Sequence, residues 1–575
     1  MSSYSDSKAY PETILFVGAG ATQRLQMPTT REQACILWTL ASLNPLSDEF
    51  KSAAENIRCF KGRSDDVVDL FRVMDGGLEN DDGIDIGDAL WNRVLPDVPK
   101  EKLSAFVQYL RLHYDWSALK LVALAKKGNC EDEIPRDEYL QEVFTLIDAC
   151  IRDNRGFLVY YKDKEVFLDV GRLKAAREAL IMLINLMFAC AWKKLVSSGD
   201  ENLPKYRSFF GTLAKCMQKE GCEFAKGRDF NQKKFYQFSY SLVTTNFEPL
   251  FLWFVWKGHD IVNHGSEVRV GNPGRLMKLL MNFPNSVGMR RLNDEGDENE
   301  PLDTSVWFPC TDAAAQNVNS SNHDDDRMFR IGKYFPVHGM SVMRHCPRCG
   351  RLNLYMGDSW SADSTSLFPN GIIKQFQFGQ KARTEEEKLA VARGEYDVLS
   401  CHFCGAITHT YDNFMCMQTQ LKCLPPSFIR ETTDEALAQI AGAKHIVLLG
   451  YSMPLDDAIW GSLLTMMSRR KGSERLYCSV AATYDAKGPE GWLCGKKLKE
   501  YVDSKSKLVE DKERIRAINN AIAVFGVENV RAYVRGIPAV FGDCSEDAVR
   551  RLMYPYDQDG WDIPEFTKSG VVRSK

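Results

Sequence analysis

Two Cys-x-x-Cys pairs in this 575-residue chain have the form that binds a metal ion: Cys346-Pro-Arg-Cys349-Gly and Cys401-His-Phe-Cys404-Gly. Each pair places two thiolates on one side of a tight turn, and four thiolates complete a tetrahedral Zn²⁺ site. The 51 residues between Cys349 and Cys401 exceed the about 15–20 of a compact zinc ribbon, so an insertion that includes Ser359–Gly394 is required. A site closed by four sulfurs leaves no open position, so we expect the metal to be structural.

A glycine-rich turn, Gly18–Thr22 (GAGAT), follows the apolar run Thr13–Val17 near the start of the chain. Such a turn lets the backbone approach a pyrophosphate, and the next helix start offers free N–H groups to it. The Gly-x-Gly-x-x-Gly fingerprint is not completed, because position 23 is Gln23. Taken alone, the turn is equally compatible with a bound nucleotide and with a buried strand that ends in glycine.

Three further segments carry polar side chains where apolar runs end. Val243–Glu248 (VTTNFE) can hydrogen-bond a ribose or an amide, or it can cap a helix. His338, followed by glycine, can act as a general base near neutral pH or be structural; its place shortly before the first cysteine pair favours a functional role. Gly450–Ser452 (GYS) is compatible with a nucleotide contact and with an ordinary turn.

The composition, with 44% apolar and 26% charged residues, is typical of a soluble globular protein. This length predicts two to four domains, or one domain with large insertions. A net charge of −4 gives no basic field, so direct nucleic-acid binding is not expected. The N-terminus lacks a basic start followed by an apolar run, so we expect no signal peptide. The 17 cysteines then indicate a reducing cytoplasm with free thiols outside the metal site.

The elements that must position these residues are a few apolar strands and many helices. Near-continuous apolarity predicts strands that are covered on both faces. The five expected strands are Thr13–Val17, Ser239–Thr244, His445–Leu449, Leu476–Ala482 and Val530–Val534.

More than 200 residues between the first two of these strands have almost wholly helical spacing, for example Glu101–Lys127 and Leu173–Val196. The most apolar segment, Ala179–Trp192, has 14 residues and is too short for a membrane span of about 20. We therefore expect this segment to be a buried helix, and we expect no association with a membrane. The polar segments Asn293–Glu300 and Asn317–Arg327 are expected to be exposed loops, because neither has the ligand spacing of a calcium loop.

Taken in order, these segments resemble the motifs of the sirtuin-like family. That family has Gly-Ala-Gly-x-Ser, a Gly-Ile-Pro-Asp-Phe-Arg loop, Thr-Gln-Asn-Ile-Asp, Leu-His-Gly, two Cys-x-x-Cys pairs and a Gly-Thr-Ser strand end. The corresponding segments here are Gly18–Thr22, Gln26–Arg31, Thr244–Glu248, Val337–Gly339, the two cysteine pairs and Gly450–Ser452. The resemblance runs in scattered blocks from Thr13 to about Val534 and leaves Glu32–Phe238 unexplained.

The departures from the deacylases of this family bear on function. Thr30 stands where those enzymes have the aromatic residue that covers the nicotinamide pocket. Glu248 replaces an Asp and is one methylene longer, and Thr245 replaces a Gln. No apolar strand that would line an acyl-lysine channel is evident after the cysteine pairs. The helical insertion, the Thr-Thr-Asn-Phe-Glu segment and Gly-Tyr-Ser are instead similar to prokaryotic sirtuin-like NAD hydrolases of antiphage defence.

The resemblance implies that Asn246 and His338 are catalytic and hold the nicotinamide end of NAD between them. It implies hydrolysis of NAD to nicotinamide and ADP-ribose; the alternatives are NAD-dependent protein deacylation and NAD or ADP-ribose sensing without cleavage. A homo-oligomer and a co-encoded ring ATPase or other defence protein are the expected partners. The implied NAD-binding residues are Gly18, Ala19, Gly20, Ala21, Thr22, Arg31, Thr245, Glu248, Gly450 and Ser452, and the zinc ligands are Cys346, Cys349, Cys401 and Cys404.

We therefore expect an α/β fold: a Rossmann-like parallel sheet with a large α-helical insertion and a zinc-ribbon module. The sheet domain is expected to comprise residues 1–31, 239–340 and 411–575, the last with a C-terminal segment. The helical insertion is expected at 32–238 and the zinc-ribbon module, with its inserted loop, at 341–410.

Overall fold

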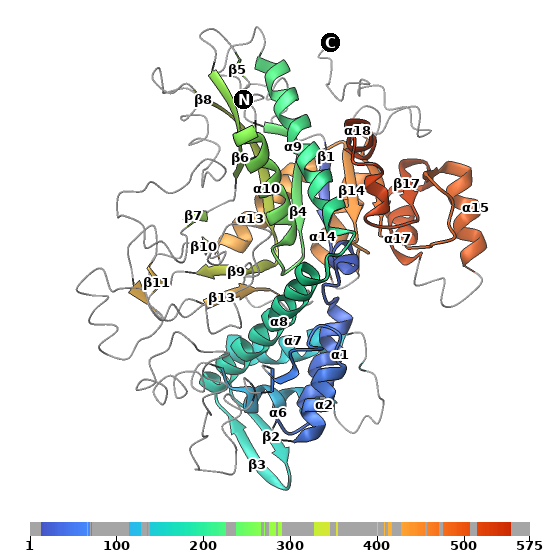
Figure 1. Ribbon diagram of the computed structural model, residues 1–575. Coiled ribbons are helices and arrows are strands. Elements are labelled where there is room, and N and C mark those ends of the chain that lie inside the picture. Colours follow the sequence, from blue (N-terminus) through green and yellow to red (C-terminus); the bar gives the residue numbers. More distant parts are fainter. Residues whose placement is uncertain are drawn as a thin grey trace, which may run out of the picture.

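The computed structural model describes most of the chain in segments (Figure 1). The described residues are 13–45, 47–65, 67–68, 71, 114–127, 135, 138–225, 237–265, 269–270, 275–282, 286–289, 327–345, 352–354, 399–400, 407–408, 412–416, 427–454, 457–470, 475–482, 484–506 and 515–553. The expected loops Asn293–Glu300 and Ser359–Gly394 lie outside these residues, as does all of Asn317–Arg327 except Arg327, and so do the four cysteines of the two pairs.

A nine-stranded sheet lies at the centre, in the order β16-β17-β15-β14-β1-β4-β8-β6-β5. The seven inner strands are parallel, and β16 and β5 at the edges are antiparallel to their neighbours. The strands are β1 (Thr13–Val17), β4 (Gln237–Thr244), β5 (Arg269–Val270), β6 (Arg275–Asn282), β8 (Arg327–Pro336), β14 (His445–Leu449), β15 (Tyr477–Ala481), β16 (Trp492–Cys494) and β17 (Val530–Tyr533).

The strand order is compatible with a Rossmann-like fold. With β6 left out, the six parallel strands have the order 3-2-1-4-5-6 when they are numbered along the chain. The winding reverses between β1 and β14, and in such sheets ligands bind outside the carboxyl ends of the strands at this reversal.

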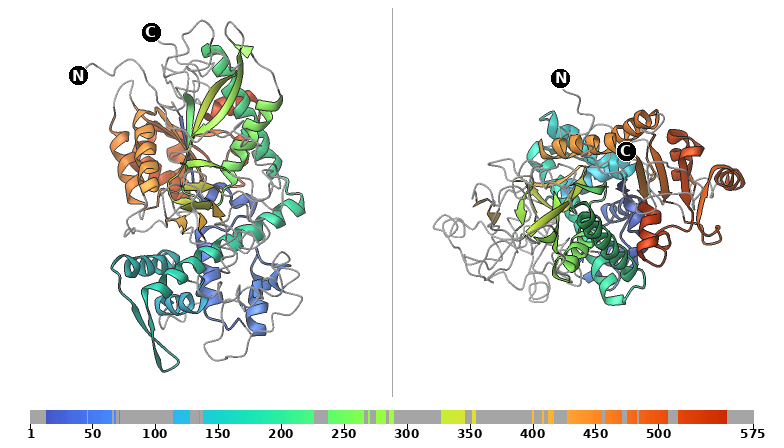
Figure 2. Two further views of the ribbon diagram at one scale, coloured as in Figure 1. Left: turned by 90° about the vertical axis from the view of Figure 1, so that its left-hand side faces the viewer. Right: turned by 90° about the horizontal axis from the view of Figure 1, so that it is seen from above.

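Helices cover both faces of the sheet, because alternate side chains of the strands point to opposite faces. Ile14 and Phe16 of β1 belong to the core beneath α13 (Ser427–Gly442), α14 (Ala458–Ser468), α15 (Gly495–Lys505) and α17 (Arg516–Phe525). Leu15 and Val17 belong to the core beneath α9 (Leu203–Ala225), α10 (Leu250–Gly265) and α18 (Glu546–Met553). Figure 2 shows α13 and α14 in orange on one side of the sheet and α9 and α10 in green on the other.

A helical body lies beyond the carboxyl end of β1, below the sheet in Figure 1. It contains α1 (Thr30–Ala41), α2 (Asp48–Asn56), α6 (Trp116–Lys127), α7 (Tyr139–Arg152) and α8 (Val170–Ser198). The 29-residue helix α8 runs from this body up to the sheet and is apolar and long enough to cross a membrane. The rest of the chain buries 88% of its most apolar window, as for a core helix.

The periodicity predicts an almost wholly helical insertion, but the insertion also contains a hairpin of β2 (Phe157–Tyr161) and β3 (Lys164–Leu168). Aromatic and β-branched residues favour strands, and the two turn residues Lys162 and Asp163 both have positive φ, as in two-residue hairpin turns. Helix α8 confirms the prediction for Leu173–Val196, and α6 confirms the C-terminal half of Glu101–Lys127.

A second sheet has the order β13-β9-β10-β7. Its strands are β7 (Ser286–Met289), β9 (Gly339–His345), β10 (Leu352–Leu354) and β13 (Asp412–Met415), so they extend beyond residues 341–410 on both sides. A separate antiparallel pair is formed by β11 (Leu399–Ser400) and β12 (Ile407–Thr408).

All five strands expected from the sequence are present, with their ends displaced by at most two residues, as β1, β4, β14, β15 and β17. They are consecutive neighbours in the parallel part of the sheet.

Candidate functional site

The polar segments singled out in the sequence leave the same edge of the sheet. Val17, the last residue of β1, is paired with Thr244 of β4 on one side and with Leu449 of β14 on the other. Thr244 in turn is paired with Pro336 of β8. The turn after β1, the Asn246 segment, His338 and the Gly450 segment therefore all start at the carboxyl ends of adjacent strands. This edge includes the reversal of winding between β1 and β14.

The glycine turn is interlocked with Gly450. The Gly18 amide donates to the Leu449 carbonyl at 2.9 Å, and the Gly20 amide donates to the Gly450 carbonyl at 3.0 Å. Gly450 has φ +60, and a Cβ there would lie 1.9 Å from the Ala21 nitrogen. Only glycine fits this contact, so the strand ends of β1 and β14 are locked together at the reversal point.

The amides of the turn are largely used by the protein itself. Gly18, Gly20, Ala21 and Thr22 donate to the carbonyls of Leu449, Gly450, Gly18 and Ala19. The half-buried Ala19 is the residue of the turn whose amide a ligand can take without breaking one of these bonds. The pyrophosphate cradle expected from Gly18–Thr22 thus has one open amide in the described structure.

A buried three-residue network joins the turn to the end of β4. Thr22 Oγ1 and Asn246 Nδ2 both donate to Glu248 Oε1, at 3.0 Å and 2.8 Å. The three side chains are no more than 4% exposed. Burial raises the pKa of Glu248 to about 7, against the opposing effect of these two hydrogen bonds. The carboxyl group therefore changes its protonation state near neutral pH.

His338 lies in a second buried cluster, formed with two residues that the sequence did not single out. Its Nε2 is 3.6 Å from Asp457 Oδ1, and Tyr451 donates from its hydroxyl to Asp457 Oδ2 at 2.5 Å. Neither ring nitrogen of His338 has a hydrogen-bond partner among the described residues, and the same holds for Asn246 Oδ1. Buried polar atoms without partners are rare, and reactive sites are one place where they occur.

The remaining expected binding residues differ in how they are held. Thr245 donates from both its amide and its hydroxyl to the Val17 carbonyl, at 3.0 Å and 3.3 Å, which ties β4 to β1. Ser452 is half-buried, and its carbonyl accepts from Asn520 Nδ2 at 2.9 Å. Arg31 is exposed in the first turn of α1, so the residue can carry charge near the turn without a desolvation penalty.

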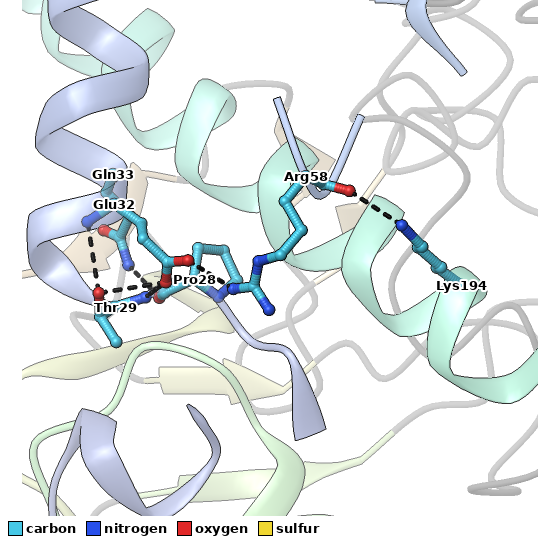
Figure 3. Close-up of polar contacts among 6 residues, drawn as sticks. All are labelled: Pro28, Thr29, Glu32, Gln33, Arg58 and Lys194. Atoms are coloured by element: carbon cyan, nitrogen blue, oxygen red, sulfur yellow. Dashed lines mark hydrogen bonds and ion pairs between the residues drawn. The ribbon is translucent and has the colours of Figure 1, made fainter. Parts of the chain in front are cut away.

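The loop that enters α1 is fixed by a capping box (Figure 3). Glu32 accepts from the Thr29 amide at 2.8 Å, and Thr29 Oγ1 accepts from the Glu32 amide at 3.3 Å. Gln33 holds the Pro28 carbonyl at 3.0 Å. Arg58 pairs with Glu32 at 2.6 Å, so the loop after the glycine turn is tied to the helical body.

The region that the sequence predicts as a helical insertion contacts the site from two directions. Tyr206 of α9 donates from its hydroxyl to the carbonyl of Ala21 at 2.5 Å. Arg177 of α8 donates to the Met415 carbonyl at 2.9 Å, and the next amide, of Cys416, donates to the His338 carbonyl at 2.7 Å. The insertion thus contacts the glycine turn directly and reaches the His338 backbone through β13.

Strand pairs are described on both sides of each cysteine pair. His345 of β9 pairs with Leu352 of β10, so Cys346–Arg351 connects two antiparallel strands. Ser400 of β11 likewise pairs with Ile407 of β12, and Cys401–Ala406 connects them. Each connection has six residues with cysteines first and fourth and glycine fifth, as in a zinc knuckle.

Comparisons with protein-family models and with curated proteins find no match to this chain. What the protein does is therefore inferred from the side chains at the carboxyl edge and from the motifs that carry them.

Proposed function

We propose that this protein is a sirtuin-like NAD hydrolase, which cleaves NAD to nicotinamide and ADP-ribose. The observation that supports this most is the convergence of Asn246 and His338 beside the glycine turn, at the reversal point of a parallel sheet. Both side chains are buried, and both carry polar atoms that have no hydrogen-bond partner among the residues that the structure describes. Such atoms are suited to bind and orient a polar substrate.

The chemistry needs orientation more than a strong nucleophile. The nicotinamide ring of NAD is cationic and leaves as a neutral molecule, so the transition state has oxocarbenium character. Asn246 Nδ2 is held by Glu248, which leaves Oδ1 to accept a hydrogen bond from a ribose hydroxyl or from the attacking water. A neutral His338 would accept a proton from either of these groups.

The rest of the dinucleotide would extend along the reversal point. The open amide of Ala19 and the exposed charge of Arg31 suit the pyrophosphate. The half-buried Ser452 on the β14 side would contact the adenosine half. Thr22 and Glu248, by cross-linking the turn and the end of β4, would hold the nicotinamide end in register with Asn246.

A structural Zn²⁺ is part of the proposal. Four thiols are a donor set that zinc prefers, and the two six-residue connections between antiparallel strands are typical of the two knuckles of a ribbon. Cys346, Cys349, Cys401 and Cys404 would hold the ion. The ion would stabilise the segment that follows His338 and take no part in the reaction.

The biological role follows from the cost of the reaction. Unregulated NAD hydrolysis would poison the host cell, so control by assembly or by a partner is expected. The resemblance to antiphage NAD hydrolases suggests an NAD-depleting cytoplasmic effector that forms homo-oligomers and acts with a co-encoded ring ATPase or other defence protein. The helical body is the candidate control element, because Arg177 of α8 links it through β13 to the backbone of His338. A strict monomer with constant activity would count against this regulated role.

Product analysis tests the reaction type. The purified chain is incubated with NAD, with and without an acyl-lysine peptide, and the products are separated by chromatography. Nicotinamide and ADP-ribose formed without peptide are the expected result. Turnover that requires the peptide and yields acyl-ADP-ribose would indicate a deacylase instead. Tight NAD binding by calorimetry with no product would indicate a sensor.

A further inference from the structure

The carboxylate of Asp457 stands at the start of a helix, but it contacts His338 and Tyr451 and does not cap the helix. Asp457 is the N-cap residue of α14, where aspartate normally accepts from the first amides of the helix. Its side chain makes no such capping bond. It points instead to the Tyr451 hydroxyl at 2.5 Å and to His338 Nε2 at 3.6 Å.

The backbone around Asp457 explains how the carboxylate is held there. Gly450 turns the chain with φ +60 at the end of β14, and Met453 has φ 52. The Asp457 amide donates to the Pro454 carbonyl at 3.1 Å, and its carbonyl accepts from the Gly461 amide at 3.1 Å. The backbone thus starts the helix without a capping bond from the side chain, which lies beside His338 instead.

The surroundings favour a strong interaction between these groups. Asp457 is 1% exposed, Tyr451 is 3% exposed and His338 is fully buried. A buried carboxylate needs hydrogen-bond donors, and the Tyr451 hydroxyl is one, through a short bond of 2.5 Å. Among the residues that the structure describes, His338 Nε2 lies 3.6 Å from the other carboxylate oxygen and could donate to it after an approach of about 0.6 Å. Catalytic hydrogen bonds are often long before substrate binds.

We propose that Asp457, itself oriented by Tyr451, is the positioning residue of His338. It keeps the imidazole in the tautomer that carries hydrogen on Nε2, so that Nδ1 is the atom that accepts the proton from the ribose hydroxyl or from water. Asp457 is not protonated in this step; it orients the ring and stabilises the imidazolium that forms. This assignment rests on the proposed function for its catalytic part, while the tautomer is a property of the protein alone.

Kinetics test the catalytic part. Asp457→Asn keeps the size of the side chain but removes its charge, and we expect turnover to fall about 100-fold or more while NAD affinity stays within about threefold. Tyr451→Phe, which leaves the carboxylate with one donor fewer, should lose about tenfold. Formate should restore part of the turnover of Asp457→Ala but not that of His338→Ala. Turnover of Asp457→Asn within about threefold of the wild type would overturn the proposal.

Nitrogen NMR tests the tautomer without any turnover. With ¹⁵N-histidine labelling, the ring signals of His338 are assigned by their loss in His338→Gln. We expect the Nε2–H tautomer in the wild-type protein and a mixed or reversed tautomer in Asp457→Asn. If NAD is not cleaved but the tautomer changes as expected, the proposed function fails and the positioning role stands. If the tautomer is the same in both proteins, the positioning role is wrong whatever the activity.

Discussion

Asn246 and Glu248 are joined by a hydrogen bond of 2.8 Å from Nδ2 to Oε1, and Thr22 donates to the same oxygen at 3.0 Å. The three residues come from two strand ends, so one buried oxygen fixes the glycine turn relative to the proposed catalytic asparagine. The amide of Asn246 cannot rotate without losing this bond. The protonation state of Glu248 therefore bears on both the stability and the geometry of the site.

The free energy of unfolding should fall as the pH rises from 4.5 to about 7, the range over which Glu248 loses its proton. The folded-state pKa of about 7 lies above the ordinary glutamate value of 4.5, because burial disfavours the charged carboxylate. The folded state therefore binds the proton more tightly than the unfolded state, and its advantage is complete below pH 4.5 and is lost as the pH rises to 7. Converted directly, this difference corresponds to about 3 kcal/mol.

Glu248→Gln, which cannot ionise, is the matched variant for this effect. Its melting temperature relative to the wild type should increase between pH 5 and pH 8, as measured by calorimetry at constant ionic strength. Asp543→Asn serves as a control, since the pKa of that exposed carboxyl is lowered by hydrogen bonds from Ser545. A difference in melting temperature between Glu248→Gln and the wild type that stays constant over this pH range would contradict the raised pKa of Glu248.

Gly450→Ala should disrupt the site and the fold together. The added Cβ would lie 1.9 Å from the Ala21 nitrogen and 2.3 Å from the Gly20 carbonyl carbon, both of them backbone atoms. We expect the free energy of unfolding to fall by about 3 kcal/mol or more, and we expect no measurable NAD binding. Gly461→Ala is the control, since a Cβ at that position in α14 meets no atom within 4 Å. Unfolding by urea and calorimetric titration with NAD measure both effects.

Arg177→Met should weaken the link between the helical body and His338. Arg177 pairs with Asp148 at 2.8 Å, with 16% and 10% of the two side chains exposed, and it also holds the Met415 carbonyl. We expect the free energy of unfolding to fall by about 3 kcal/mol, because the buried Asp148 loses its ion pair with Arg177. Arg177→Met combined with Asp148→Asn should recover part of this stability but not the turnover.

Arg172→Met is the matched control for this change. Arg172 pairs with Asp115 at the same distance of 2.8 Å, but its side chain is 32% exposed, and the pair lies within the helical body. The Arg172→Met variant should lose about 1 kcal/mol in its free energy of unfolding and keep its turnover. Equal turnover of the folded Arg177→Met and Arg172→Met proteins would show that the contact through β13 does not influence the site.

The metal prediction is tested by composition. The purified chain should contain one zinc ion, measured by plasma mass spectrometry, and Cys346→Ser or Cys404→Ser should lose it and melt at a lower temperature. Cys416→Ser is the control, since Cys416 lies close to His338 but forms no disulfide and stands outside the two pairs. A metal-free wild-type protein, or zinc retained in both pair variants, would be incompatible with the proposed site.

The parallel half of the fold could be predicted from the sequence because its strands are short, apolar and bounded by glycine or polar residues. Strand β8 was not predicted from the sequence, because Arg330 and Lys333 interrupt its apolar pattern. Both residues are nevertheless buried, and Lys333 is paired with Glu435 at 2.6 Å. Strand β6 escaped because its Leu, Met and Lys residues favour helices rather than strands.

The candidate site could be predicted only in part. Asn246 and His338 stand at strand ends next to glycine or threonine, which is a local signal. Asp457 gives no such signal, because an aspartate before an apolar helix has the ordinary explanation of a helix cap. Its role depends on a contact with a residue far away in the chain, and only the fold brings the two together.

The most direct test of the central proposal is the rate of nicotinamide release from NAD by the wild-type protein and by Asn246→Ala and His338→Ala. The exposed His264 of α10 provides the control variant His264→Ala. We predict release by the wild type and by the control, with a loss of about 100-fold or more in the two site variants. No release by the wild type in any assembly state, or unchanged release in both site variants, would contradict the proposed function.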